Sequence, residues 1–260
     1  MTFVGRVLFL GTGSSAGVPV VGCRCDTCKS KDLHDKRLRP SILLQLQDKT
    51  FLIDPGPDFR QQALKHDINH LDGVIVTHVH YDHTGGLDEL RSYYFISERP
   101  MPTLVSEHTI EDLSKRYHYL LKPTAEGGSL SARLDFESFP NGRGEVDFQG
   151  VKIKYFSYSQ AGMPVNGFRF GNFAYVTDIH EYPETIFEDL KGVDTLVVSA
   201  LRYTPSNLHL TVDEAIDFAK KVGAKRVFLT HIAHEISHEK CKSYLPEEVT
   251  LAYDGLSFDL

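Results

Sequence analysis

The hydrophobic positions of this chain fall into short runs separated by polar turns. Residues 7–10, 74–77, 195–199 and 226–230 are apolar throughout their centres. Such runs between turn signals are typical of strands that are buried on both faces. The pattern therefore predicts strands that lie in the middle of a layered fold.

Other runs come in pairs with a turn between them. Residues 41–46 and 51–53 flank a polar stretch, residues 146–156 alternate around Gln149-Gly150, and residues 167–170 and 173–177 flank Gly171-Asn172. Short connections that contain glycine or asparagine favour β-hairpins. We therefore expect three antiparallel pairs of strands.

Helical spacing occupies other parts of the chain. Thr211 and Glu214 form a capping box ahead of apolar positions with helical spacing, namely Val212, Ala215, Ile216, Ala219 and Val222. Asp58 is expected to cap a helix that ends near residue 65. Residues 87–121 are expected to be mostly helical around a strand at 103–105, and residues 122–133 to form a loop. The chain is predicted to be one α/β domain, 1–260, with a helical insertion at about 87–135.

Composition and charge narrow the class of protein. The 260 residues are 41% hydrophobic, and 28 basic residues stand against 35 acidic ones, a net charge of −7. An acidic balance argues against nucleic acid as the partner. Apolar stretches fall short of the ~20 residues of a membrane span, and the first residues do not resemble an export signal. We expect a cytoplasmic protein that does not bind a membrane.

The candidate chemistry follows the apolar run at 74–77. His78 and His80 alternate on an extended backbone and so point to the same side, and Asp82 and His83 follow in the turn. Three imidazoles and a carboxylate within six residues suit Zn²⁺, Mn²⁺ or Fe²⁺. A polar surface loop would not be expected to gather three histidines directly after a buried strand. The segment therefore predicts a metal site.

Three further residues of ligand type end other apolar runs. Asp54, Asp178 and His231 each stand where a predicted strand stops. Loops at strand ends are where α/β folds assemble their sites. We expect these distant segments to meet at the histidine cluster.

The segment from His78 to His83 resembles the HxHxDH signature of the metallo-β-lactamase superfamily, and the similarity extends to the glycine loop at 11–15 and to Asp54-Pro55-Gly56. The resemblance implies a four-layer αββα sandwich with two divalent metals, zinc or manganese, in its catalytic site. It also implies a role for each residue: His78 and His80 bind the first metal, Asp82, His83 and His231 bind the second, Asp178 bridges both, and Asp54 orients ligands through hydrogen bonds.

One expected ligand differs from the family pattern. Relatives place a histidine ahead of a Gly-Phe-Arg hairpin, whereas this chain has Gln160 there. A glutamine oxygen is a harder and weaker ligand than imidazole. The first metal is therefore expected to bind loosely, to be manganese or magnesium, or to be lost. His180 is the alternative ligand.

A second metal site is indicated near the beginning of the chain. Cys23, Cys25 and Cys28 lie too close together for a disulfide framework, and in a cytosolic protein this spacing indicates metal binding. A closed zinc site needs a fourth ligand, for which His234 is the first candidate and His238 the second. The cysteine motif is similar to that of the PhnP-like subgroup, named for a cyclic-phosphate phosphodiesterase. That resemblance implies a structural zinc with His234 as the fourth ligand.

His209 precedes the capping-box helix in the loop after residues 195–199. In the PhnP-like and tRNA 3′-processing groups a histidine in this place contacts the scissile phosphate, so the resemblance implies that His209 is catalytic, together with Asp82. A histidine with a pKa near ~6.5 can donate a proton at neutral pH. A loop histidine without a catalytic role is the alternative.

The resemblance implies a metal-dependent phosphodiester hydrolase. Its substrates would be small or cyclic phosphodiesters, such as ribosyl 1,2-cyclic phosphate or 2′,3′-cyclic nucleotides, and relatives are often homodimers. The metals would lower the pKa of a bound water toward ~7. Candidate substrate contacts are Arg202, Tyr203 and the four tyrosines Tyr93, Tyr94, Tyr117 and Tyr119, although we favour packing for the four.

Three other hypotheses use the same residues. The chain could be an RNA 3′-processing endonuclease of the tRNase Z type, against which the acidic charge argues. It could hydrolyse another ester class, such as thioesters or lactones. It could also be a degenerate protein that only binds metal, with Gln160 as the sign of lost activity.

Overall fold

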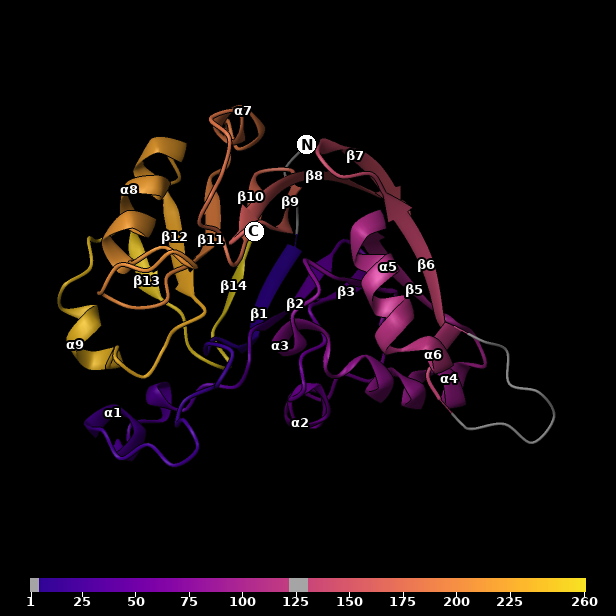
Figure 1. The fold of residues 1–260 in the computed structure, drawn as a ribbon, viewed down its shortest axis with the longest axis horizontal. Coiled ribbons are helices and arrows are strands. Elements are labelled where there is room, and N and C mark those ends of the chain that lie inside the picture. Colours follow the sequence, from indigo (N-terminus) through magenta and orange to yellow (C-terminus); the bar gives the residue numbers. More distant parts are fainter. Residues whose placement is uncertain (1–4, 122–130) are drawn as a thin grey trace.

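The computed structural model describes residues 5–121 and 131–260. In this part of the chain two seven-stranded sheets lie in the middle of the molecule, with helices on their outer sides (Figure 1). The first sheet has the order β14-β1-β2-β3-β4-β5-β6, and the second has the order β13-β12-β11-β10-β9-β8-β7. The first consists of β1 (Gly5–Gly11), β2 (Ser41–Leu46), β3 (Lys49–Ile53), β4 (Gly73–Ile75), β5 (Met101–Ser106), β6 (Leu134–Phe139) and β14 (Ser257–Asp259). The second consists of β7 (Arg143–Phe148), β8 (Val151–Gln160), β9 (Met163–Phe170), β10 (Phe173–Val176), β11 (Thr195–Ser199), β12 (Arg226–Thr230) and β13 (Val249–Leu251).

The central strands are buried on both faces because each sheet packs against the other sheet and against helices. In β1, Phe9 belongs to the core between the sheets, while Leu10 belongs to the core under the first layer of helices. In β12, Phe228 faces the first sheet and Leu229 faces the second layer of helices. Successive side chains of a strand point to opposite faces, so both faces need apolar residues. This explains the continuous apolar runs of the sequence.

The helices form the two outer layers. Over the first sheet lie α2 (Phe59–Lys65), α4 (Arg91–Ser97), α5 (Glu107–Arg116) and α6 (His118–Leu121). Over the second lie α7 (Ile186–Asp189), α8 (Val212–Val222) and α9 (His238–Lys242). The short helices α1 (Asp26–Lys29) and α3 (Tyr81–Thr84) carry residues of the two predicted metal sites, and 3₁₀ turns occupy Leu33–Asp35 and Leu87–Leu90. The predicted αββα sandwich is confirmed.

Most predicted elements are present, and the differences have physical reasons. The predicted hairpins are β2–β3, β7–β8 and β9–β10, and the capping box begins α8. The strands β6, β13 and β14 were missed because they form sheet edges, where exposed positions interrupt the apolar pattern. Of the predicted helical insertion, residues 87–121 are largely helical, but β5 and the start of β6 lie in the first sheet, so these parts belong to the sandwich. Residues 122–130 of the predicted loop lie outside the described residues.

Asp58 precedes α2 as predicted, but its side chain does not cap the helix. Its carboxylate instead accepts a hydrogen bond from the Arg39 backbone at 2.8 Å and pairs with the Arg39 guanidinium at 3.0 Å. The residue thus fastens the loop before β2 to the start of α2.

A buried polar cluster ties the beginning of the chain to its end. The Arg37 guanidinium donates to Thr12 Oγ1 at 2.7 Å and lies 3.2 Å from His238 Nδ1. Asp254 accepts from the backbone of Thr12 at 2.9 Å and of Leu38 at 2.7 Å. Buried polar groups that satisfy one another specify a single arrangement of the segments that carry them.

Among the described residues, no helix has the length and apolar character that crossing a bilayer requires.

Candidate metal centre

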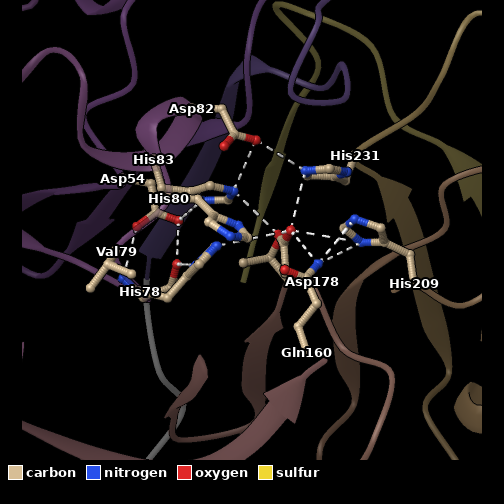
Figure 2. Close-up of polar contacts among 12 residues, drawn as sticks. Asp54, His78, Val79, His80, Asp82, His83, Gln160, Asp178, His209 and His231 are labelled. Carbon is tan, nitrogen blue, oxygen red and sulfur yellow. Dashed lines mark hydrogen bonds and ion pairs between the residues drawn. The ribbon is translucent and has the colours of Figure 1, made fainter. Parts of the chain in front are cut away.

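Loops from both sheets meet at one edge of the sandwich (Figure 2). Asp54 directly follows β3, the histidine segment follows β4, Asp178 comes after β10, and His231 directly follows β12. Asp54, Asp178 and His231 have φ values of 61°, 54° and 62°. Residues other than glycine rarely adopt this conformation, and those that do concentrate at functional sites. Three of the residues that meet at this edge thus have a backbone conformation that is typical of functional sites.

The ligand atoms at this edge form three overlapping groups, within each of which all atoms lie within 4.8 Å of one another. Asp178, His209 and His231 make up one of them, and we call the other two the first and second metal groups. The first consists of His78, His80 and Asp178, and the second of Asp82, His83 and His231. These are the sets that the resemblance assigned to the two metals.

Asp178 lies between the two metal groups. Its Oδ1 is 4.0 Å from His78 Nε2 and 3.4 Å from His231 Nε2, and its Oδ2 is 3.2 Å from His83 Nε2. Figure 2 shows the surrounding imidazoles directed toward this carboxylate. Oδ1 thus faces both groups and Oδ2 faces the second, so the carboxylate lies where a bridging ligand is needed.

The imidazole nitrogens that face the centre fit divalent metals. His78 Nε2 and His83 Nε2 are buried, and neither has a hydrogen-bond partner among the described residues. Their other nitrogens are engaged, since His78 Nδ1 lies 2.9 Å from Thr77 Oγ1 and His83 Nδ1 lies 2.7 Å from Asp54 Oδ2. Such contacts fix the tautomer whose Nε2 lone pair is free to bind a metal. Buried polar atoms rarely stay unpaired, so a cation explains these two.

The charges of the centre are arranged to receive cations. Burial alone would raise the pKa of Asp178, but the neighbouring His231 and His83 hold that pKa well below its usual range. Burial would likewise lower the pKa of His83, but the carboxylates of Asp178, Asp82 and Asp54 raise it well above its usual value. Burial raises the pKa of Asp54, whereas Asp178 and Asp82, whose pKa values are both lowered, are therefore anionic at neutral pH. Their negative charge offsets the cost of placing metal ions at a buried site.

His209 lies beside the second metal group. Its ring stacks on His231 with 4.8 Å between centroids, and its Nδ1 is 3.7 Å from Asp178 Oδ1. Burial, with the nearby His231, lowers the pKa of His209 to about 4. The pattern of residues along the sequence did not show this burial, which moves the pKa below the ordinary value of about 6.5. The imidazole is neutral at pH 7 until an anion binds beside it.

Gln160 lies at the end of β8 and is 3% exposed. Its Nε2 is 3.2 Å from Asp178 Oδ1 and 3.0 Å from His209 Nε2. The structure therefore places Gln160 against the predicted bridging residue and the predicted catalytic histidine. His180, the alternative ligand, belongs to neither metal group in the described part of the chain, and its Nδ1 is buried without a hydrogen-bond partner there.

The cysteine motif forms a separate group with His234. His234 Nδ1 lies 3.3 Å from Cys23 Sγ, 3.4 Å from Cys25 Sγ and 3.6 Å from Cys28 Sγ. Ligands of a tetrahedral zinc with the usual Zn–S and Zn–N bond lengths are separated by about 3.5 Å. The four residues thus have the spacing of a closed zinc site. His238, the second candidate, contacts Arg37 instead.

The remaining candidate residues contact other side chains of the protein or pack against its core. Arg202 lies 3.9 Å from Glu235, and the Tyr203 ring lies 6.2 Å from that of Tyr244. Among the four tyrosines, Tyr93 and Tyr117 pack against the core under the first layer of helices, Tyr94 is half-buried and Tyr119 is 38% exposed. Packing is therefore the role that the structure gives to Tyr93 and Tyr117.

Two residues of the centre were not identified from the sequence. Thr77 Oγ1 donates to Asp54 Oδ2 at 2.8 Å and lies beside His78, so this one hydroxyl orients both an acid and a ligand. Arg116, at the end of α5, donates to the Val79 carbonyl inside the histidine segment. The position of Thr77 directly before His78 was a usable signal, whereas no local pattern links residue 116 to residue 79.

Comparison with known proteins gives the family. The protein family described as "Beta-lactamase superfamily domain" matches residues 49–232 of this chain. The zinc-bound PqqB of Methylobacterium extorquens has the same fold, with a TM-score of 0.78 over 98% of this chain and 100% of that one at 18% identity. The chain belongs to the beta-lactamase superfamily and has the metallo-β-lactamase fold.

Two further relatives are more similar in sequence. A crystal structure described as a new diphosphatase from the PhnP family is 36% identical, covers 98% of both chains and has a TM-score of 0.88. The resemblance to PhnP-like proteins is thereby confirmed. An octanoyltransferase of Porphyromonas gingivalis is 34% identical over 256 residues, which are 96% of this chain and 51% of that protein. The chain thus spans about half the length of this curated relative.

Proposed function

We propose that this chain hydrolyses small phosphodiesters, including cyclic ones such as ribosyl 1,2-cyclic phosphate and 2′,3′-cyclic nucleotides. The observation that carries the proposal is the position of His209, which is buried against His231 and Asp178. Both metal groups have three members without it. A further imidazole beside such groups is suited to a proton transfer or to contact with an anionic oxygen.

We assign different roles to the residues of the centre: some would bind the metals, some orient the ligand rings, and His209 transfers a proton. Two divalent metals, when bound, would activate water and stabilise negative charge on phosphate oxygens. Asp54 and Thr77 hold the rings of His83 and His78 with Nε2 directed into the centre. His209 is neutral alone, and a bound phosphate anion raises its pKa, so that a ring nitrogen takes up a proton. The imidazolium then donates this proton to the leaving oxygen of the substrate.

A diphosphate linkage is the second candidate for the bond that is cleaved. The relative described as a PhnP-family diphosphatase is 36% identical over 98% of both chains, which supports this candidate. In a diphosphate one oxygen bridges two negatively charged phosphoryl groups, and its hydrolysis, like that of a diester, is attack of water on phosphorus with departure of an oxygen, so the same residues suit either bond. The octanoyltransferase activity is not carried over, because this chain spans only 51% of that protein.

The test is a substrate panel with the purified protein and added Mn²⁺ or Zn²⁺. The panel contains bis-p-nitrophenyl phosphate, 2′,3′-cyclic nucleotides, a nucleoside diphosphate, a tRNA precursor and a thioester. We expect turnover of the small diesters, and His209→Ala should lower kcat by about 10²–10⁴ with metal content unchanged. His70→Ala is the matched control, because the His70 side chain is 74% exposed.

Other outcomes would redirect the proposal. Preferential cleavage of the diphosphate would favour the second candidate, and cleavage of the tRNA precursor or thioester alone would favour those ester classes. Full metal occupancy without turnover of any substrate would reject catalysis and leave a metal-binding protein.

A further inference from the structure

The two metal groups do not offer the same number of ligands. Asp178 is shared, so the second group has three side chains of its own and the first has two, His78 and His80. His80 is exposed, whereas the second group is buried throughout. Fewer protein ligands, one of them open to water, hold a metal less tightly. Gln160 contacts Asp178 on its Oδ1 side, where His209 and His231 also lie, and it is the residue found where relatives place a further ligand.

The amide of Gln160 is oriented to donate and not to coordinate. Its Nε2 lies 3.2 Å from Asp178 Oδ1, to which it donates a hydrogen bond. An amide oxygen in that place would face a carboxylate oxygen and be repelled. The same Nε2 lies 3.0 Å from His209 Nε2 and 3.2 Å from His209 Nδ1, within hydrogen-bond distance of the ring. The NH₂ group thus contacts both neighbours.

We propose that Gln160 is a positioning residue that holds Asp178 and His209 by donating hydrogen bonds. It leaves the first metal group with three protein ligands, and this group therefore exchanges its metal readily while the second group retains its metal. The inference rests on the proposed function in that both groups are taken to bind divalent cations. It gives the glutamine a definite role where relatives place a ligand histidine.

The two possible roles of Gln160 predict opposite effects of truncation. If Gln160 only donates to Asp178, removing its side chain leaves every ligand of the first group in place. If its oxygen were a ligand, removing it would weaken the first metal by about tenfold or more. Introducing an imidazole at position 160 would add a ligand in either case.

The experiment is a Mn²⁺ titration of protein whose cysteine site keeps its zinc. Equilibrium dialysis gives the number of bound ions and their Kd values, and electron paramagnetic resonance separates isolated Mn²⁺ from a coupled pair. For the wild type we expect one tight ion and a second whose Kd is at least about tenfold higher. Gln160→His should lower that higher Kd by about tenfold or more. Gln45→His, on the exposed face of β2, is the matched control and should change neither Kd.

Gln160→Ala separates positioning from ligation. We expect its higher Kd to change by less than about threefold, because Thr177 Oγ1 still donates to Asp178 Oδ2 at 2.6 Å. By contrast, kcat at saturating Mn²⁺ should fall by about 10–100-fold because His209 is no longer held. A tenfold weaker second ion in this variant, or two equal Kd values in the wild type, would overturn the proposal. The wild-type titration needs no variant to fold. Absence of Mn²⁺ binding in the wild type would overturn the inference by removing its premise, whereas lack of turnover with the two Kd values as expected would reject only the proposed function.

Discussion

Replacing Asp54 by asparagine is expected to weaken the second metal group through the tautomer of His83. Asp54 is fully buried and accepts hydrogen bonds from Thr77 N at 2.8 Å, Thr77 Oγ1 at 2.8 Å and His83 Nδ1 at 2.7 Å. Asparagine has the same shape and tolerates the φ of 61° at this position. The backbone can therefore stay in place while the chemistry of the side chain changes.

The substitution changes which ring nitrogen of His83 carries the proton. The asparagine oxygen accepts from Thr77 N, so its NH₂ group faces His83 Nδ1, which must then accept. The ring proton of His83 moves to Nε2, the atom directed at Asp178 and the second metal group. A protonated Nε2 cannot bind a metal. Losing one charge-assisted hydrogen bond costs about 1.5–3 kcal/mol, which corresponds to roughly 10–100-fold in metal affinity.

Competition with a chelator of known affinity measures this effect directly. Asp58→Asn is the matched control, since Asp58 pairs with Arg39 and belongs to neither metal group. The control should lower the Tm by a few degrees and leave metal affinity unchanged. Wild-type affinity in the Asp54 variant, or equal losses in both variants, would refute the argument from the tautomer.

Three further predictions concern the surroundings of the centre. In Gly56→Ala the new Cβ would lie 2.3 Å from the Asp82 carbonyl oxygen, so the histidine segment must shift, and metal titration should show about tenfold weaker binding or more. Removing zinc from the Cys28 site with a chelator should lower the Tm by roughly 8–16 °C in calorimetry, and a Tm shift below a few degrees would contradict a structural zinc. Burial, with the charge of Arg37, lowers the pKa of His238 from 6.5 to about 4. Between these two values the unfolded chain binds a proton that the folded chain does not. The free energy of unfolding therefore falls as the pH drops from about 6.5 to about 4. His238→Asn should therefore lose less stability than the wild type between pH ~7 and ~5 in urea unfolding, and an identical loss would show that another group dominates.

The fold could be predicted from the sequence wherever burial was complete. The strand β11 is buried at every position and stands out as a continuous apolar run. The strand β14 has no fully buried position and pairs only with β1 at the sheet edge, so its residues carry no distinctive pattern. Apolar periodicity reports what a residue packs against, and an edge strand packs against little.

In the candidate site too, some features could be predicted from residue type, and others depend on contacts in three dimensions. His78, His80 and Asp82 were identified because the type and spacing of ligands follow from metal chemistry. The low pKa of His209 depends on its burial and on His231, and the contact between Gln160 and His209 joins residues that are 49 apart in the chain. Such contacts leave no local pattern, so the sequence identified Gln160 as unusual without giving its role.

The cysteine site and the metal centre are coupled through one short segment. His231 belongs to the second metal group, and His234, three residues later, belongs to the cysteine site. Between them Ile232 donates to the Thr12 carbonyl and accepts from Ser14 N, at 2.8 and 2.9 Å. The segment is thus held to the glycine loop at one point and to the cysteines at the next, while His231 keeps a φ of 62°. A backbone in this conformation needs support from its surroundings. A zinc held by the three cysteines and His234 would supply that support to His231.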